Sequence, residues 1–194
     1  MKNFEYDLRY LQAGLDVLLD YLLSSETFWP IDVHPPVGEP EYPQLTLGSL
    51  LLAKSRLTGY PKSPTQVDQV DKLFSDLDHV RSRWRVAWEN KAGHSFSVRL
   101  RMWRDFIEEY RNAPQDNADR YPYEVRLRTM LSLLQSEGGE QLPAEADLLT
   151  VLDAYIKSVL SMGGFVWEPE IQAGFPKDVY WYLYGKLPSV PRKN

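Results

Sequence analysis

The sequence predicts an all-α protein, an antiparallel helical bundle of about six or seven helices with a long Pro-rich crossover after the first helix. Three observations lead to this prediction. Apolar residues recur at alternating spacings of three and four along most of the chain, which is the period of a half-buried helix. Short stretches containing glycine or proline separate most of these segments. The composition, 43% hydrophobic and 25% charged, is that of a globular domain.

The first helix is expected over residues 3–25. Its apolar side chains cover most of its girth and leave only a narrow polar stripe. Such a helix lies at the centre of a bundle or packs on two sides, one of which could be formed by another subunit.

The crossover is expected over residues 26–45, because five prolines in this segment exclude a helix and a central strand. The segment nevertheless contains large apolar side chains, among them Phe28, Trp29 and Ile31. Loops of this length are uncommon in compact domains and are often functional. We interpret these three residues either as a plug over the core or as an interaction arm that contacts a second subunit or lines a pocket.

A helix is expected over residues 46–58. Thr46 is a good N-cap residue, and Gly59 is expected to end this helix in the left-handed conformation.

Two longer helices are expected next, over residues 65–90 and 95–111, each with a continuous apolar stripe. We place the break between them at residues 92–94, which include a glycine. One unbroken helix over 65–111 is the alternative.

In the remainder of the chain, the sequence pattern predicts a polar loop over residues 112–120 and helices over 122–136 and 143–162. A short helix is expected over 176–184, within an aromatic C-terminal segment. No strand is predicted.

Length favours a single helical-bundle domain over residues 1–187, followed by a disordered tail over 188–194. The chain has no cysteine, so disulfides and thiolate chemistry are excluded, which fits a reducing compartment. The first ten residues are rich in charge and do not resemble a signal peptide, and no apolar stretch is long enough to span a membrane. We therefore expect a cytoplasmic protein without a membrane partner.

No signature of catalysis is found, and an enzyme is not favoured. A nucleophile elbow and both glycine-rich phosphate-binding motifs are missing from the sequence, so no cofactor is expected. Asp76 and His79 share a helix face, but di-iron bundles need two such motifs and further carboxylates. We therefore expect no metal site and regard these two residues as weak candidates.

The charge distribution is uneven, with 11 basic and 7 acidic residues between positions 81 and 128 of a chain whose net charge is −5. Most of these basic residues have an acidic residue three or four positions away, as on an ordinary exposed helix face. Three arginines have none: Arg83, Arg99 and Arg126. Arg99 also precedes Trp103 by four residues and could stack on its ring. If the three arginines converge, they would form a site for an anion.

Three functions remain as hypotheses. The first is a non-enzymatic module that binds another protein or a second copy of itself, suggested by the apolar first helix and the aromatic crossover. The alternative is a binding protein or enzyme that takes a small ligand or anion through the arginines and Trp103. The third is nucleic-acid binding through residues 81–128, which the sequence pI of about 5.3 makes unlikely.

Overall fold

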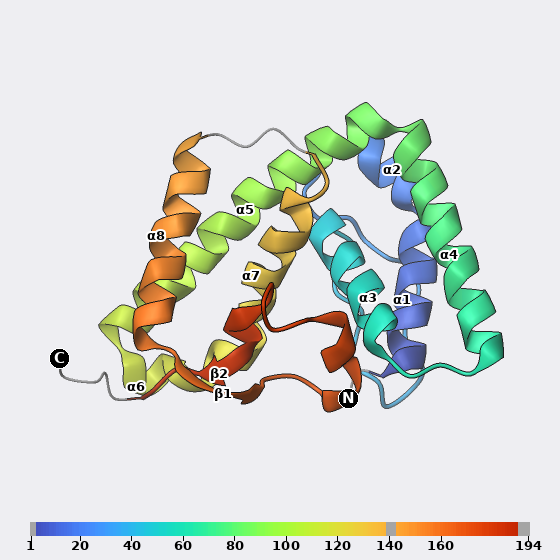
Figure 1. Ribbon diagram of the computed structural model, residues 1–194. Helices are drawn as coiled ribbons and strands as arrows, with labels where there is room; N and C mark the ends of the chain where they lie inside the picture. Colours follow the sequence, from blue (N-terminus) through green and yellow to red (C-terminus); the bar gives the residue numbers. More distant parts are fainter. Residues whose placement is uncertain (1–2, 139–142, 190–194) are drawn as a thin grey trace.

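The computed structural model describes residues 3–138 and 143–189, and it confirms the all-α class. Helices dominate the fold, and one small antiparallel sheet lies near the C-terminal end of the described chain. Figure 1 shows two long helices, α4 (Pro64–Arg83) and α5 (Arg85–Asn112), forming an arch over the N-terminal helices. The buried apolar side chains form one contiguous cluster that runs through all of these elements.

The first predicted helix is two helices, α1 (Phe4–Asp16) and α2 (Leu18–Leu23), which meet at Val17. The side chain of Asn3 caps α1 by accepting a hydrogen bond of 2.8 Å from the backbone N–H of Tyr6. The apolar surface of α1 packs against other helices of the same chain, namely α3 (Leu47–Gly59) and α4.

The N-cap prediction for α3 is confirmed, because the hydroxyl of Thr46 accepts a hydrogen bond from the backbone N–H of Ser49. The prediction for Gly59 is wrong, since this residue belongs to α3 and its φ is not positive. A glycine is needed there for a different reason. A Cβ atom at Gly59 would collide with the backbone carbonyl of Ile171, on the segment that packs against α3.

The break between the two long helices lies at Trp84, so both the predicted break at residues 92–94 and the unbroken alternative are wrong. Gly93 lies inside α5. A glycine inside a helix costs only about 1 kcal/mol, which the burial of Ala92 and Phe96 in the core offsets. The turn at Trp84 lets α4 pack on α1 while α5 packs on α7 (Tyr121–Gln135).

The predicted loop over 112–120 is also wrong in detail, since it forms α6 (Pro114–Asn117) and a 3₁₀ turn, η1 (Ala118–Arg120). Pro114 occupies the first position of α6, where proline favours a helix. The side-chain amide of Asn117 stabilises it by donating a hydrogen bond of 2.9 Å to the carbonyl of Ala113. The helix predicted over 122–136 corresponds to α7.

The C-terminal elements differ most from the prediction. The helix α8 (Pro143–Val159) ends before residue 162, and strand β1 (Ser161–Phe165) follows it. The helix predicted over 176–184 does not form. Its last residues lie in the 3₁₀ turn η3 (Trp181–Leu183) and in strand β2 (Tyr184–Lys186), which pairs with β1.

Glycines explain this sheet, which the helical pattern did not reveal. A Cβ atom at Gly185 would lie 2.6 Å from the carbonyl oxygen of Ser161, so only glycine lets the strands approach this closely. The chain then passes under α5, where the hydroxyl of Tyr110 donates a hydrogen bond of 2.9 Å to the carbonyl of Pro188. Of the tail predicted to be disordered, Pro188 and Ser189 belong to the described chain, and residues 190–194 lie outside it.

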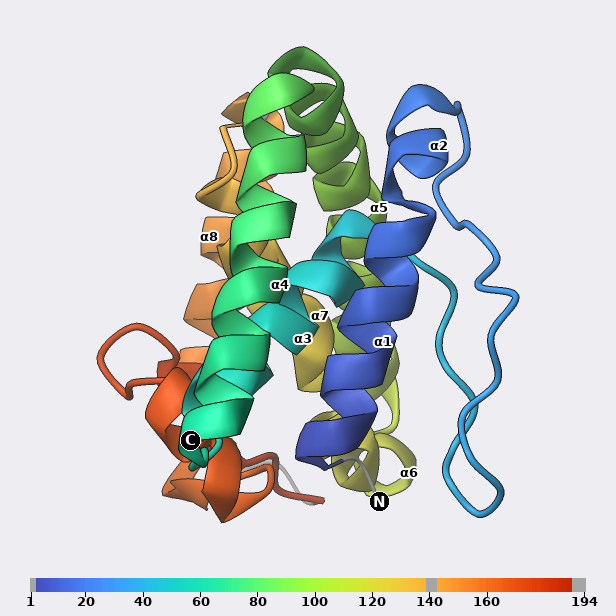
Figure 2. The same cartoon turned by 90° about the vertical axis from the view of Figure 1, so that its right-hand side faces the viewer.

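The crossover follows one side of the molecule as an extended loop between α2 and α3, as Figure 2 shows. Trp29 and Leu45 close this loop at its base through two backbone hydrogen bonds of 3.0 and 2.8 Å. The loop is also held to α1 by a salt bridge of 2.6 Å between Arg9 and Glu39. Over the described residues, no helix has both the length and the apolar character needed to cross a membrane.

Candidate anion-binding cavity

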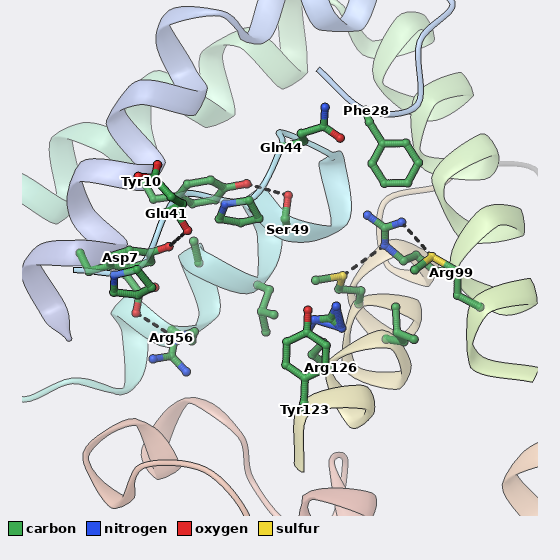
Figure 3. A pocket seen from close by; sticks show the side chains of 18 residues that line it. Asp7, Tyr10, Phe28, Glu41, Gln44, Ser49, Arg56, Arg99, Tyr123 and Arg126 are labelled. Atoms are coloured by element: carbon green, nitrogen blue, oxygen red, sulfur yellow. Dashed lines mark hydrogen bonds and ion pairs between the residues drawn. The ribbon is translucent and has the colours of Figure 1, made fainter. Parts of the chain in front are cut away.

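A cavity of about 480 Å³ lies between the crossover and the helices α1, α3, α5 and α7 (Figure 3). Each of these elements is placed by the shared core, so the cavity brings together residues that are far apart in the sequence. Its volume is in the range of small-molecule sites. Most of its lining surface is apolar; Arg99 lies on one side of it, and Asp7, Glu41 and Arg56 lie on the other.

The first end is formed by Arg99 of α5, whose guanidinium points into the cavity although the residue is only 5% exposed. It donates a hydrogen bond of 2.8 Å to the hydroxyl of Thr46. Its other contacts are to the thioether sulfurs of Met130 at 3.4 Å and Met102 at 3.5 Å, which are weak acceptors. No carboxylate forms an ion pair with Arg99 anywhere in the described chain.

A second guanidinium is close enough for its charge to act on Arg99. Arg126 of α7 lines the same cavity, and its Nη1 atom is buried without a hydrogen-bond partner among the described residues. The nearest carboxylate, that of Glu124, lies 4.0 Å away, too far for a hydrogen bond. The guanidinium instead stacks on the ring of Tyr123, 3.7 Å from its centroid. Burial lowers the pKa of Arg99, and the positive charge of Arg126 lowers it further.

A side chain of the crossover covers the end of the cavity that contains Arg99. The ring centroid of Phe28 lies 5.2 Å from the guanidinium carbon of Arg99, which is a cation–π contact. Phe28 is 41% exposed, so the ring separates the guanidinium from solvent without being part of the core. The other two residues of the predicted interaction arm, Trp29 and Ile31, are half-buried against the core.

A chain of hydrogen bonds fixes the position of Arg99. The hydroxyl of Tyr10 on α1 donates to Ser49 at 2.7 Å, and Ser49 lies 2.9 Å from the hydroxyl of Thr46, which accepts from Arg99. Burial raises the pKa of Tyr10 far above its ordinary value, so this hydroxyl stays protonated and acts as a donor. The N-terminus of α3 therefore holds the guanidinium at the cavity wall.

The opposite end has a complete ion pair. Arg56 of α3 donates a hydrogen bond of 2.8 Å to the carboxylate of Asp7 on α1, and the hydroxyl of Tyr60 donates to the same carboxylate oxygen at 3.2 Å. Burial has the largest single effect on the pKa of Arg56 and lowers it, but Asp7, Tyr60 and Glu168 together outweigh burial and the net pKa is raised. Arg56 shows how this fold compensates a buried arginine, and Arg99 has no such partner.

The residues proposed from the sequence separate into two groups. Arg99 and Arg126 meet at the cavity, whereas Arg83 lies exposed at the end of α4 and does not line it. Trp103 is fully buried and stacks on Phe106 at 5.6 Å, so the aromatic partner of Arg99 is Phe28 and not Trp103.

The weak metal candidates Asp76 and His79 are exposed on α4. In the portion of the chain that the structure describes, no three His, Cys, Asp or Glu side chains are grouped so that they could hold a metal ion.

The sequence did not reveal which residues hold the cavity arginines in place or pair with them. The sequence identifies Thr46 only as an N-cap. It places Phe28 on an arm that contacts a second subunit or lines a pocket, but it gives no sign of the contact with Arg99. The pairing of Asp7 with Arg56 spans 49 positions and has no local signal. No protein-family model matches this chain, and neither a curated protein nor a solved structure is detectably similar to it.

Proposed function

We propose that this protein binds a small anionic ligand, whose carboxylate or phosphate group contacts Arg99 and Arg126 in the cavity. The observation that carries the proposal is a buried guanidinium that faces a cavity, lacks an acidic partner in the described chain and shares the cavity with a second guanidinium. This function corresponds to the second of the three hypotheses drawn from the sequence.

The energetic argument concerns uncompensated charge. Burying a cation without an anion costs several kcal/mol even after relaxation, so buried arginines are normally paired. The two sulfur contacts of Arg99 compensate little of this cost, because thioethers are weak acceptors. A bound carboxylate or phosphate would form short, charge-assisted hydrogen bonds with the guanidinium, often two at once. Ligand binding would therefore supply the missing counter-charge.

The other two hypotheses find less support. The apolar surface of the helix predicted over residues 3–25 suggested self-association. Over α1 this surface contacts α3 and α4, and only Leu19 and Leu23 of α2 are exposed large apolar side chains of this segment. Much of the positive charge between residues 81 and 128, which suggested nucleic-acid binding, is neutralised by ion pairs. The arginines with a carboxylate oxygen at 3.0 Å or closer are Arg81, Arg85, Arg104, Arg120 and Arg128, whereas the contact of Arg126 with Glu124 is 4.0 Å long.

Thermal unfolding at constant ionic strength tests the proposal, with acetate or inorganic phosphate replacing chloride. We expect both anions to raise the melting temperature of the wild-type protein, because a ligand that binds only the folded state stabilises it. The variant Arg99→Met should lose this response. Its own stability without ligand should equal or exceed that of the wild type, because an unpaired buried charge is removed.

Arg83→Met is the matched control, since it removes an exposed arginine outside the cavity and should retain the full response. If Arg99→Met fails to fold, Arg126→Gln provides a second test at a partly exposed position. The proposal is wrong if neither anion stabilises the wild type more than chloride does. It is also wrong if the Arg99 and Arg83 variants respond equally.

A further inference from the structure

We infer that the ligand of this cavity is an amphipathic organic monoanion, a carboxylate joined to an apolar body, and not an inorganic ion or a polyphosphate. The inference rests on the proposed anion site and specifies its ligand class. Three properties of the cavity lead to it: the net charge of its lining, its apolar wall and its size.

The charge of the lining matches a single negative charge. Among the described residues, three arginines and two carboxylates face the cavity, which gives a net charge of +1. The carboxylates, Asp7 and Glu41, lie toward the end opposite Arg99, as Figure 3 shows. A ligand carrying several phosphates would extend from the guanidiniums toward these like charges. A monoanion held at Arg99 neutralises the cavity without this repulsion.

The wall between the two ends is apolar. Leu52 and Ala53 of α3 and Leu127 and Met130 of α7 line the cavity, and Met102 of α5 adds a second thioether beside Arg99. Methionine side chains adapt their shape to irregular apolar partners. These side chains offer no strong hydrogen bond, so what they contact favourably is a hydrocarbon or an aromatic body.

The volume gives the third argument. Acetate or phosphate would occupy only a small part of about 480 Å³ and would leave the apolar wall in contact with water. Removing apolar surface from water is the main source of affinity in such sites, at roughly 25 cal/mol per Å². The cavity therefore favours a ligand long enough to cover the wall from the guanidiniums toward Tyr6 and Tyr10.

A series of straight-chain carboxylates tests the inference by calorimetric titration of the wild-type protein: acetate, butyrate, hexanoate and octanoate. We expect the affinity to rise about fourfold for each added methylene until the wall is covered. Octanol tests the need for the charge, and it should bind far more weakly than octanoate. Inorganic pyrophosphate represents the polyanion and should bind no more tightly than acetate.

A cavity-filling variant separates the wall from the anion site. Ala53→Leu places a larger side chain on the apolar wall, so it should keep the affinity for acetate and lose most of the gain for octanoate. Arg99→Met should lose both. Ser97→Ala, on the same helix as Arg99 but outside the cavity lining, should bind the whole series as the wild type does.

The outcomes distinguish this inference from the proposed function. If octanoate binds no more tightly than acetate, or if pyrophosphate binds most tightly, the ligand class is wrong while the anion site stands. If octanol binds as tightly as octanoate, the cavity is a purely apolar site and both proposals fail. If no compound in the series binds, both fail as well.

Discussion

Arg128 of α7 and Asp153 of α8 form a two-point ion pair in which both nitrogen–oxygen distances are 2.7 Å. The guanidinium also donates to Ser132 at 2.7 Å and lies over the ring of Tyr182. Arg128 and Arg99 are thus both buried arginines of the same core, and they differ in one respect. Arg128 has a carboxylate that matches its geometry, whereas the guanidinium of Arg99 faces a cavity.

Asp153→Asn tests the importance of this ion pair. Because it leaves the buried charge of Arg128 without its counter-ion, we expect the free energy of unfolding to fall by about 3 kcal/mol. Urea denaturation measures the change. Arg85→Gln is the control, since it breaks an exposed pair with Glu89 and should leave the transition where it is. Equal effects of the two variants would contradict this account of the α7–α8 contact.

Close packing of α3 against the segment η2 (Pro169–Gly174) gives a second prediction. A Cβ atom at Gly59 would collide with the carbonyl of Ile171, and one at Gly174 would collide with the carbonyl of Ser55. We expect either substitution by alanine to cost at least about 2 kcal/mol of stability, because backbone must move to relieve the overlap. Gly164→Ala is the control, since open space surrounds that position. Unfolding transitions that coincide with the control would show that this contact is not tight.

Phe28→Ala tests the cover of the cavity. Removing the ring exposes the guanidinium of Arg99 to water, and water weakens the attraction between the guanidinium and a bound carboxylate. We therefore expect the affinity for octanoate to fall about two- to fivefold. The urea midpoint should change little, since the ring is not part of the core. Val33→Ala alters an exposed residue of the same crossover and should bind normally; an unchanged affinity in the Phe28 variant would separate the crossover from ligand binding.

The buried tyrosines predict a loss of stability in alkali. Burial raises the pKa of Tyr6 and of Tyr182 to about 12. An unfolded tyrosine loses its proton near pH 10, so between pH 10 and about 12 the folded state binds more protons than the unfolded state. The stability present below pH 10 is therefore lost as the pH rises through this window, at about 1.4 kcal/mol per pKa unit for each group.

Urea titrations at pH 8, 10 and 11 measure this loss, and tyrosinate absorbance in the native protein follows the ionisation directly. We expect only part of the 12 tyrosines to ionise before the protein unfolds. A free energy of unfolding that stays constant from pH 8 to pH 11 would contradict the buried, protonated state of these hydroxyls.

Local sequence signals determined the class of this fold and most of its helices. The helical period of apolar residues located α3, α7 and most of α8, and the N-cap role of Thr46 followed from its residue type. Prolines determined that residues 26–45 form neither helix nor central strand. These features depend on neighbours within about four positions along the chain, which is why a single sequence reveals them.

Tertiary structure decided where the long helices separate, because the turn at Trp84 depends on which partner each helix packs against. It also determined that the small sheet forms. The close backbone contact at Gly185 needs a glycine, and the helical spacing of apolar residues in this segment does not indicate it. The sequence identified Arg99, Arg126 and Arg83 only as arginines without a local acidic partner. Packing of α5 against α7 brought the first two to one cavity and left Arg83 at the surface, since convergence depends on long-range contacts and not on spacing.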